Sequence, residues 1–485
     1  MLLARLLEVL EDAVVDGAID RNAEIDGLTV DSRTAGSGAL FVALRGEHVD
    51  AHRFVANALA GGAVAAVVER DAEGERKLIR VPDTRLALSK LAARFYGQPS
   101  HALRVAGITG TNGKTTTSYL VRAVLDACGI PCGHIGTLGA SYREWTRELA
   151  NTTPLPIELH ETLAAMRDLG ARAVAMEVSS HALALHRVDD IRFAVGAFTN
   201  LTRDHLDFHG TFESYAAAKR RLFDLAASAV IGVDDATGAR WAAELRAVGL
   251  PTVDYALDAP AELRATAIAT TESGTTFELK GTGIRVELPL TGRFNVANAL
   301  CALGIARALG CDLHVAANAL HAVAPVPGRM ERYVRDGVLA IVDYAHTPDA
   351  LANVLRAARD ASRGRLFVVF GCGGDRDAGK RPEMGAVANE LADVVVVTSD
   401  NPRSEDPATI ARAIVAAVPR AEIELDRRAA IRRAIGDARA GDVVVVAGKG
   451  HEAYQTIGDV RAHFDDRDEV RAALAARPEE LKANA

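Results

Sequence analysis

The sequence has few cysteines, no long apolar stretch and no long basic run, and each scarcity argues against a class of protein. Only five of its 485 residues are cysteine, and Cys128 and Cys132 form the only close pair, so no zinc site built from two such pairs is predicted. A reduced, cytoplasmic protein with free thiols is therefore expected. No stretch reaches about 18 uninterrupted apolar residues, so we expect no membrane span. The net charge of -8 is spread along the chain, which argues against nucleic acid as a partner.

The remaining composition is typical of a globular protein with more than one core. Hydrophobic residues make up 49% of the chain and charged residues 25%, so each domain can bury apolar side chains. At about 100–200 residues per domain, the length favours three domains. Residues 1–20 contain apolar residues interrupted by Arg5, Glu8 and Glu11, and we interpret this segment as an amphipathic helix and not as a signal peptide.

The pattern of strands and helices predicts an α/β protein whose domains comprise residues 1–100, 101–328 and 329–485. The first domain alternates short strands with helices and ends at a turn-like GQPS. In the second, apolar strands separated by helical patterns predict a parallel sheet, and threonine-rich alternation over 255–291 predicts antiparallel strands at its edge. The third restarts the strand–helix alternation and is expected to be a doubly wound, Rossmann-like domain.

The strongest local motif is GITGTNGKTTT at 107–117, a glycine-rich loop between an apolar strand and a helix. Backbone N–H groups and the helix N-terminus of such a loop bind phosphates. Lys114 can reach the β- and γ-phosphates, and the Thr115 hydroxyl can bind Mg²⁺. A glycine-rich turn with an incidental lysine is the alternative. The motif predicts a P-loop ATPase domain in the middle of the chain.

Acidic and imidazole side chains follow two later strands. Glu177 comes at the carboxyl end of an apolar strand, where it faces the ligand crevice of a parallel sheet and is placed to bind a metal or a water. The run Asp204, His205, Asp207 and His209 offers oxygen and nitrogen ligands for a hard cation. A surface glutamate and a solvated polar loop are the corresponding structural alternatives.

Lys219 lies in the middle of an apolar helical face. Three- and four-residue spacing places Phe212, Tyr215, Leu222 and Phe223 on the same face. A buried ammonium must find a partner, extend to solvent or lose its proton. A neutral amine can react with carbon dioxide to form a carbamate, which is an anionic metal ligand. The alternative is a lysine that extends to solvent.

The chain resembles the Mur ligase family along nearly its whole length. The motifs TVDSRTAGSGALFVALRG, NTTP, EVSSHAL, TNLTRDHLDFHGTFESYAAAKRRLF, GRFNVANALCA, VPGRMER, VDYAHTPDAL and GCGGDRDAGKRPEMG follow in family order. Within the family, the chain is most similar to the members that add meso-2,6-diaminopimelate. The resemblance implies an ATP-dependent ligase that joins this amino acid to UDP-N-acetylmuramoyl-L-alanyl-D-glutamate in cytoplasmic peptidoglycan precursor synthesis.

The resemblance also implies a role for each matching position. ATP would be bound by Gly110, Thr111, Asn112, Gly113, Lys114, Thr115, Thr116, Asn298, Arg329 and Asp343. One Mg²⁺ would be held by Thr115 and Glu177, and a second by His205 and Lys219 as its carbamate, formed with carbon dioxide. The UDP-linked substrate would contact Val30, Ser32, Glu47, His48, Val49, Asn151, Thr152, Thr153, Ser179 and Arg187. Lys114, Lys219, His205 and Glu177 form the expected catalytic set.

The last domain carries DNPR at 400–403 directly after an apolar strand. Arg403 offers a planar fork that suits a carboxylate, although an Asn-Pro turn with an exposed arginine is common. In the family this tetrapeptide recognises diaminopimelate, whose second carboxylate lysine lacks. The implied pocket consists of Arg376, Asp400, Asn401, Pro402, Arg403, Gly448 and Glu452, with Glu452 as partner of the distal ammonium.

Other functions share part of this evidence. A lysine-adding Mur ligase and a folylpolyglutamate synthetase-like ligase would share the ATP-binding half. The DNPR segment argues against the first, and the N-terminal domain of UDP-binding type argues against the second. A P-loop NTPase without an amino-acid acceptor is a third possibility, and the acceptor-like last domain argues against it. We expect a monomer that binds no nucleic acid.

Overall fold

The structure is a computed structural model that describes residues 1–46, 49–271 and 274–477. Contacts within the chain divide it into two compact units, which are described separately. The first unit comprises Met1–Thr109, Gly129–Ala197 and Ala217–Ala229. The second comprises Gly110–Cys128, Phe198–Ala216 and Val230–Ala485.

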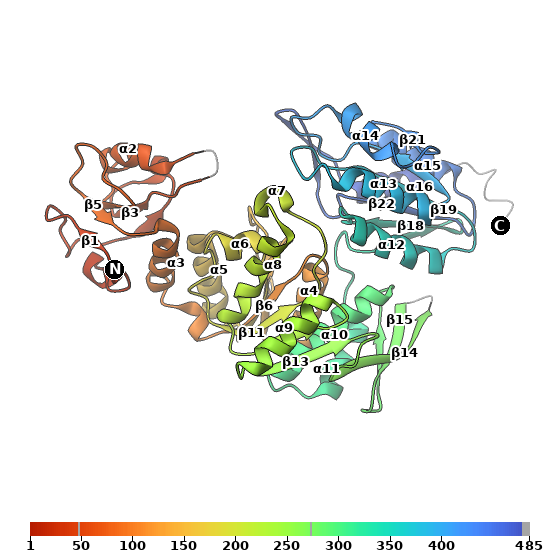
Figure 1. The fold of residues 1–485 in the computed structure, drawn as a ribbon, viewed down its shortest axis with the longest axis horizontal. Coiled ribbons are helices and arrows are strands. Elements are labelled where there is room, and N and C mark those ends of the chain that lie inside the picture. The colour runs from red at the N-terminus through yellow and green to blue at the C-terminus, as the bar shows by residue number, and fades with distance from the viewer. Residues whose placement is uncertain (47–48, 272–273, 478–485) are drawn as a thin grey trace. The chain divides into compact units, whose positions relative to one another are not determined.

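The first unit begins with a five-stranded sheet in the order β1-β5-β4-β3-β2 (Figure 1). These strands are β1 (Val14–Val15), β2 (Gly27–Thr29), β3 (Ala39–Val42), β4 (Ala65–Val68) and β5 (Leu78–Arg80). The helices of this part are α1 (Leu3–Leu7), α2 (Val55–Ala60) and α3 (Thr84–Phe95). The helix expected over residues 1–20 ends at Leu7, because the β-branched Val14 and Val15 pair with β5 instead.

A second sheet of the first unit holds the strands that precede the functional motifs, in the order β11-β6-β10-β7-β8-β9. They are β6 (Arg104–Thr109), β7 (Cys132–Gly136), β8 (Gly139–Tyr142), β9 (Trp145–Arg147), β10 (Ala173–Glu177) and β11 (Phe193–Phe198). β10 pairs in parallel with both β6 and β7, as the apolar runs predict. The helices α5 (Pro156–Asp168) and α6 (Ser180–Ala184) follow β9 and β10 in the chain.

The second unit contains the helix that follows the glycine-rich loop, α4 (Lys114–Ala127), which packs against α10 (Arg293–Ala308). Its strands run in the order β16-β15-β14-β13-β12. They are β12 (Ala229–Gly232), β13 (Thr252–Ala256), β14 (Leu263–Thr271), β15 (Gly274–Leu279) and β16 (Ile284–Leu288). The pairs β14–β15 and β15–β16 are antiparallel, which confirms the prediction for residues 255–291. The helices α7 (Leu206–His209), α9 (Ala236–Ala247) and α11 (Leu313–Ala319) complete this part.

The C-terminal sheet of the second unit has the strand order β17-β18-β22-β19-β20-β21. The strands are β17 (Glu331–Arg335), β18 (Val338–Asp343), β19 (Leu366–Phe370), β20 (Val394–Val397), β21 (Glu422–Ile423) and β22 (Val443–Ala447). All neighbours are parallel except β17 and β18.

Helices cover both faces of this C-terminal sheet (Figure 1). One core packs alternate strand residues against α12 (Pro348–Ala361), α13 (Lys380–Leu391) and α14 (Pro407–Val415). The other packs the opposite residues against α15 (Arg427–Asp437) and α16 (Asp466–Ala475). Burial on both faces explains the continuous valine runs and confirms the doubly wound prediction. A hairpin of β23 (Tyr454–Ile457) and β24 (Val460–His463), which was not predicted, follows β22.

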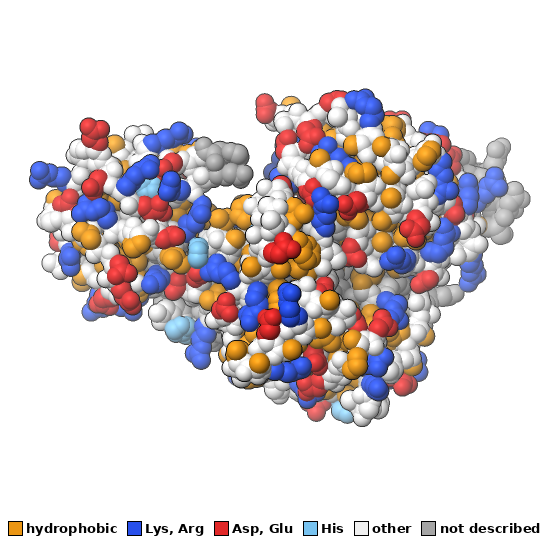
Figure 2. All heavy atoms as spheres, viewed as in Figure 1, with side chains coloured by type: hydrophobic (Ala, Val, Ile, Leu, Met, Phe, Trp, Pro, Cys, Tyr) orange, Lys and Arg blue, Asp and Glu red, His pale blue; other side chains and the backbone are white. Residues whose placement is uncertain are grey.

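Charged side chains of both signs are interspersed over the face of the molecule seen in Figure 2. Within the described ranges, no helix combines the length and the apolar character that crossing a membrane requires.

Candidate active site

The glycine-rich loop of the second unit has a backbone that only glycine fits at two positions. Gly110 has φ 146° and Gly113 has φ 87°. A Cβ atom on Gly110 would lie 1.9 Å from Oγ1 of Thr199, and one on Gly113 would lie 2.3 Å from Oδ1 of Asn298. The loop packs closely on Thr199 and Asn298. A side chain at either glycine position would therefore push the loop away from these neighbours.

Side chains from the rest of the second unit hold this loop. The backbone N–H of Asn112 donates to Oδ1 of Asn200 over 2.9 Å, and its side-chain amide donates to Oδ2 of Asp349 over 2.9 Å. The Thr111 hydroxyl lies 3.0 Å from the Tyr215 hydroxyl. A loop fixed in this way keeps its N–H groups oriented, as phosphate binding requires.

Lys114, Thr115 and Arg329 meet at the N-terminus of α4. The Lys114 ammonium donates to the carbonyl oxygens of Gly110 and Thr111 over 2.9 and 2.8 Å, so it folds back onto its own loop. A guanidinium N–H of Arg329 donates to Oγ1 of Thr115 over 3.0 Å. Thr115 and Thr116 are both buried. Two predicted ATP-binding residues far apart in sequence, Thr115 and Arg329, are thus in direct contact.

Asp343 and Asn298 are buried polar residues of the same unit. The Asp343 carboxylate accepts N–H bonds from Met330 (2.7 Å) and Ala345 (2.8 Å). Burial raises the pKa of the Asp343 carboxyl, while Arg329 and these N–H groups act in the opposite direction. Asn298 accepts a hydrogen bond from the Thr117 hydroxyl over 3.3 Å.

The run at 204–209 does not converge as a cation site. Asp204 is buried and lies 3.4 Å from Nε2 of His205 and 3.8 Å from Nε2 of His346. Burial alone would raise the pKa of Asp204, but His346, His205 and Lys380 hold it well below its usual range. No group of three or more His, Cys, Asp and Glu side chains suited to a metal occurs within the described part of the chain.

In the first unit, Glu177 and Thr153 form the centre of a polar cluster. The Glu177 carboxylate accepts hydrogen bonds from the N–H (2.9 Å) and the hydroxyl (3.0 Å) of Thr137. The Thr153 hydroxyl donates to the carbonyl oxygen of Glu177 over 2.9 Å and accepts the N–H of Ser179 over 3.0 Å. The Arg187 guanidinium donates to the carbonyl oxygen of Thr153 over 2.9 Å. Four predicted residues therefore lie together.

Thr137 is a residue of this cluster that the sequence reasoning missed. It directly follows β7, which pairs with β10, so its place at the carboxyl end of a parallel strand was the available signal. Its hydroxyl also lies 3.1 Å from that of Thr152. Burial lowers the pKa of Arg187, and the nearby charge of Arg85 lowers it further.

The other predicted contacts of the UDP-linked substrate also lie in the first unit. Val30 and Ser32 are partly buried on either side of Asp31, and Asn151 and Val49 are exposed. Glu47 and His48 fall outside the described residues.

Lys219 is only 1% exposed, in α8 (Phe212–Arg220). The predicted apolar face is correct for Tyr215, which is buried in the same helix, but Phe212 is 38% exposed. Leu222 and Phe223 are buried in a 3₁₀ turn, because the α-helix ends at Arg220. The prediction of a buried lysine is confirmed, although the face around it is shorter than the spacing suggested.

The predicted diaminopimelate residues gather at the carboxyl ends of β20 and β22 in the second unit. The Arg403 backbone is left-handed, with φ 52°, and its guanidinium donates to the carbonyl oxygen of Gly374 over 2.6 Å. The Asn401 amide donates to Oε2 of Glu452 over 2.9 Å. A Cβ atom on Gly448 would lie 2.6 Å from the Asp400 carboxylate, so these two loops touch.

Two further predicted residues border this pocket. Pro402 is buried between Asn401 and Arg403, and its carbonyl oxygen packs on Gly374. Arg376 is exposed and donates to the carbonyl oxygen of Asp375 over 2.9 Å.

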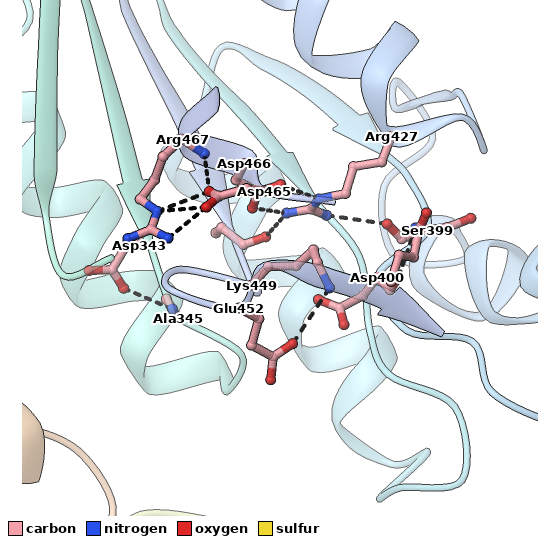
Figure 3. A network of polar contacts seen from close by, with 12 residues as sticks. Asp343, Ala345, Ser399, Asp400, Arg427, Lys449, Glu452, Asp465, Asp466 and Arg467 are labelled. Carbon is pink, nitrogen blue, oxygen red and sulfur yellow. Dashed lines mark hydrogen bonds and ion pairs between the residues drawn. The ribbon is translucent and has the colours of Figure 1, made fainter. Parts of the chain in front are cut away.

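Lys449 and Arg427 belong to the same region and were not predicted (Figure 3). The Lys449 ammonium is buried and donates to Oδ1 of Asn401 over 3.1 Å and to Oε2 of Glu452 over 3.5 Å. Burial lowers the pKa of Lys449, while Asp400 and Glu452 raise it. The lysine within GKGHE could have indicated a role for Lys449 from the sequence, whereas nothing in the sequence around Arg427 indicates one.

The predicted catalytic residues belong to different units. Glu177 and Lys219 are part of the first unit, and Lys114 and His205 are part of the second.

Comparison with known proteins assigns the chain to a class. The models that match are the Mur ligase family, catalytic domain (residues 24–96), the Mur ligase middle domain (108–306) and the Mur ligase, glutamate ligase domain (328–450). The chain belongs to the Mur ligase family and has its three-domain α/β fold, so it is an ATP-dependent ligase that forms amide bonds.

Similar relatives match the chain over nearly its whole length. A UDP-N-acetylmuramoyl-L-alanyl-D-glutamate–2,6-diaminopimelate ligase of Thermosynechococcus vestitus is 46% identical over 97% of this chain and 98% of its own. A protein of the same name from Gloeobacter violaceus is 45% identical over 98% of each chain. A solved structure with this name superposes with a TM-score of 0.71 at 35% identity, covering 98% of this chain and 99% of its own.

Proposed function

We propose that the protein adds meso-2,6-diaminopimelate to UDP-N-acetylmuramoyl-L-alanyl-D-glutamate at the expense of ATP. The observation that carries this proposal is the group of charged side chains on the loops that follow β20 and β22. It presents the Arg403 guanidinium and the Glu452 carboxylate on adjoining loops. These charges are complementary to the carboxylate and the ammonium at the distal centre of diaminopimelate. The relatives that carry this activity in their names support the same substrate pair.

The ATP-binding half is proposed to be the loop of residues 110–116 with Lys114, Asn298, Arg329 and Asp343. Loop N–H groups and Lys114 would bind the phosphates, for which Lys114 must leave the carbonyl oxygens of its own loop. Arg329 is already anchored beside the loop through Thr115. This position suits a role for Arg329 in binding the triphosphate of ATP.

The proposed metal ligands fit Mg²⁺ by their chemistry. Thr115 offers a hydroxyl oxygen and Glu177 a buried carboxylate that Thr137 orients. His205 and the Lys219 carbamate would hold a second ion. When bound, Mg²⁺ offsets the repulsion between ATP and the substrate carboxylate.

The carbamate proposal rests on the burial of Lys219. The Lys219 amine is only 1% exposed, and an amine in its neutral form can attack carbon dioxide. The neutral nitrogen forms a bond to carbon and releases one proton, which gives an anionic carbamate. Starting from the ammonium cation, two protons are released in all.

The proposed reaction forms the amide in two steps. The γ-phosphoryl group of ATP passes to the γ-carboxylate of the D-glutamyl residue, which gives an acyl phosphate and ADP. The free amine of diaminopimelate attacks the acyl carbon and gives up one proton, and phosphate leaves and takes up that proton as the tetrahedral intermediate collapses. Positive charge on Lys114 and the loop N–H groups would stabilise the charge that develops on the transferred group. The polar cluster of Thr152, Thr153, Ser179 and Arg187 would orient the muramoyl dipeptide.

The remaining features are proposed as follows. The three functional parts are residues 1–100, 101–328 and 329–485, which bind the UDP-linked substrate, ATP and the amino acid. The enzyme is proposed to act as a monomer in the cytoplasm, where its five free thiols would stay reduced.

Phosphate release tests the function. The assay contains ATP, Mg²⁺ and UDP-N-acetylmuramoyl-L-alanyl-D-glutamate, with either meso-diaminopimelate or L-lysine. We expect release that depends on diaminopimelate, with a product whose mass shows the new amide. A preference for lysine would overturn the assignment of Arg403, and release that is indifferent to either amino acid would favour an NTPase.

A further inference from the structure

Arg427 is a fully buried cation beneath the amino-acid pocket. It is the first residue of α15, and both its side chain and that of Asp466 are 0% exposed. Its Nε and one terminal nitrogen donate to the two carboxylate oxygens of Asp466, each over 2.7 Å (Figure 3). A buried ion pair is often no more stabilising than apolar side chains of similar volume, so stability alone does not explain its presence.

The remaining donors of Arg427 connect two strands. One N–H group donates to the carbonyl oxygen of Ala447 over 2.9 Å, and another to that of Ser399 over 3.3 Å. Ala447 is the last residue of β22, and Ser399 follows β20. The next residues along the chain are Gly448 and Asp400, with which the two loops of the pocket begin.

No backbone ladder joins these two strands directly. In the sheet, β19 lies between β22 and β20, so their ends are two strand spacings, about 9–10 Å, apart. The guanidinium of Arg427 therefore connects the ends of two strands that β19 separates. Lys449 connects the same loops a second time, through Asn401 and Glu452.

We propose that Arg427, held by Asp466, is a positioning residue that sets the spacing of the diaminopimelate pocket. The inference rests on the proposed function, because it takes the loops after β20 and β22 as the amino-acid site. Arg427 donates to both loop origins while its planar fork stays fixed on one carboxylate, which a lysine cannot do. Loss of this link would loosen the origins of the two loops that carry Arg403 and Glu452 without removing either charge.

The test separates stability from positioning. In the double variant Arg427→Met with Asp466→Leu, apolar side chains replace the ion pair, so the fold is expected to be retained, but the carbonyl oxygens of Ser399 and Ala447 lose their donor. We expect the KM for diaminopimelate to rise by about tenfold or more, up to the hundredfold effect that a 1 Å misplacement can have. The KM for ATP and for the UDP-linked substrate should stay close to that of the wild type.

Asp442→Asn is the matched control. Asp442 binds Arg365 over 3.0 and 3.2 Å, and both residues lie at the opposite, amino ends of β22 and β19. This change also breaks an Arg–Asp pair of the same sheet, and we expect it to lower the melting temperature while it leaves the KM for diaminopimelate unchanged.

Each outcome decides the question. If the folded double variant keeps the wild-type KM for diaminopimelate, or loses affinity for all three substrates equally, Arg427 does not position this pocket. If the double variant does not fold, the isosteric Asp466→Asn decides by the same comparison. A wild-type enzyme that shows no dependence on diaminopimelate contradicts the proposed function itself, which is a different result from an unchanged variant.

Discussion

His160 is a histidine whose replacement should make the protein less sensitive to mild acid. It lies in α5 of the first unit and is 0% exposed, and neither ring nitrogen has a hydrogen-bond partner among the described residues. Burial lowers its pKa from 6.5 to about 4, because the charged imidazolium cannot be solvated there. The unfolded chain therefore takes up a proton near pH 6.5, whereas the folded chain resists it until about pH 4.

The sign and the size of the effect follow from these two values. Because the folded-state pKa of His160 is depressed, the contribution of this residue to stability is fully present above pH 6.5. That contribution is lost as the pH falls toward 4. For a group with a pKa of 6.5 unfolded and about 4 folded, the free energy of unfolding falls by about 2 kcal/mol between pH 7 and pH 5.

The variant His160→Leu removes this titration and the two unsatisfied nitrogens. We expect it to be more stable than the wild type by about 1–3 kcal/mol at pH 7. The advantage should grow by about 2 kcal/mol at pH 5. Urea unfolding followed by circular dichroism at both pH values measures the difference, since the titration of other groups is common to both proteins. An advantage of the same size at both pH values would refute the reasoning.

His52 provides the control of opposite sign in the same unit. It is also buried, but its Nδ1 lies 2.6 Å from the Asp50 carboxylate and its Nε2 accepts the N–H of Glu69 over 2.9 Å. His52→Leu leaves the N–H of Glu69 without its acceptor and removes one partner of the Asp50 carboxylate, so we expect a loss of about 1–3 kcal/mol at pH 7.

Two predictions concern the proposed reaction. Lys219→Ala should remove most of the ligase activity, and added bicarbonate or a short carboxylic acid should partly restore it. The control Arg220→Ala, which removes a surface ion pair with Asp224, should keep wild-type rates. Full activity of Lys219→Ala would exclude the carbamate role. Arg403→Ala should raise the KM for diaminopimelate by about ten- to a hundredfold, as loss of a charged hydrogen bond implies, with little change for ATP; equal losses for both substrates would mean that the pocket is misassigned.

The strands and the main motifs could be predicted from sequence because their signals are local. The valine runs of the C-terminal sheet are continuous, since both faces are covered, and the glycine-rich loop has an unmistakable strand before it and helix after it. The antiparallel strands after Ala256 likewise show a regular alternation in sequence.

The features that were missed depend on partners far along the chain. Arg427 looks like a solvated charge at a helix start, and it is buried only because Asp466, 39 residues later, meets it. Thr137 depends on Glu177, 40 residues away, in the same manner. Phe212 shows the converse, since helical spacing placed it on a buried face and the fold leaves it exposed.

Asp343 has a consequence for the interpretation of kinetic data. Its carboxylate fixes Met330, the neighbour of Arg329, while its own carbonyl oxygen accepts the N–H of Gly448 over 3.1 Å at the start of an amino-acid loop. One residue at the end of β18 thus contacts both the proposed ATP-binding region and a proposed amino-acid-binding loop. A substitution of Asp343 should change the apparent affinities for nucleotide and amino acid together. A change in both affinities would then show that the two regions share a structural residue, and not that distant sites communicate.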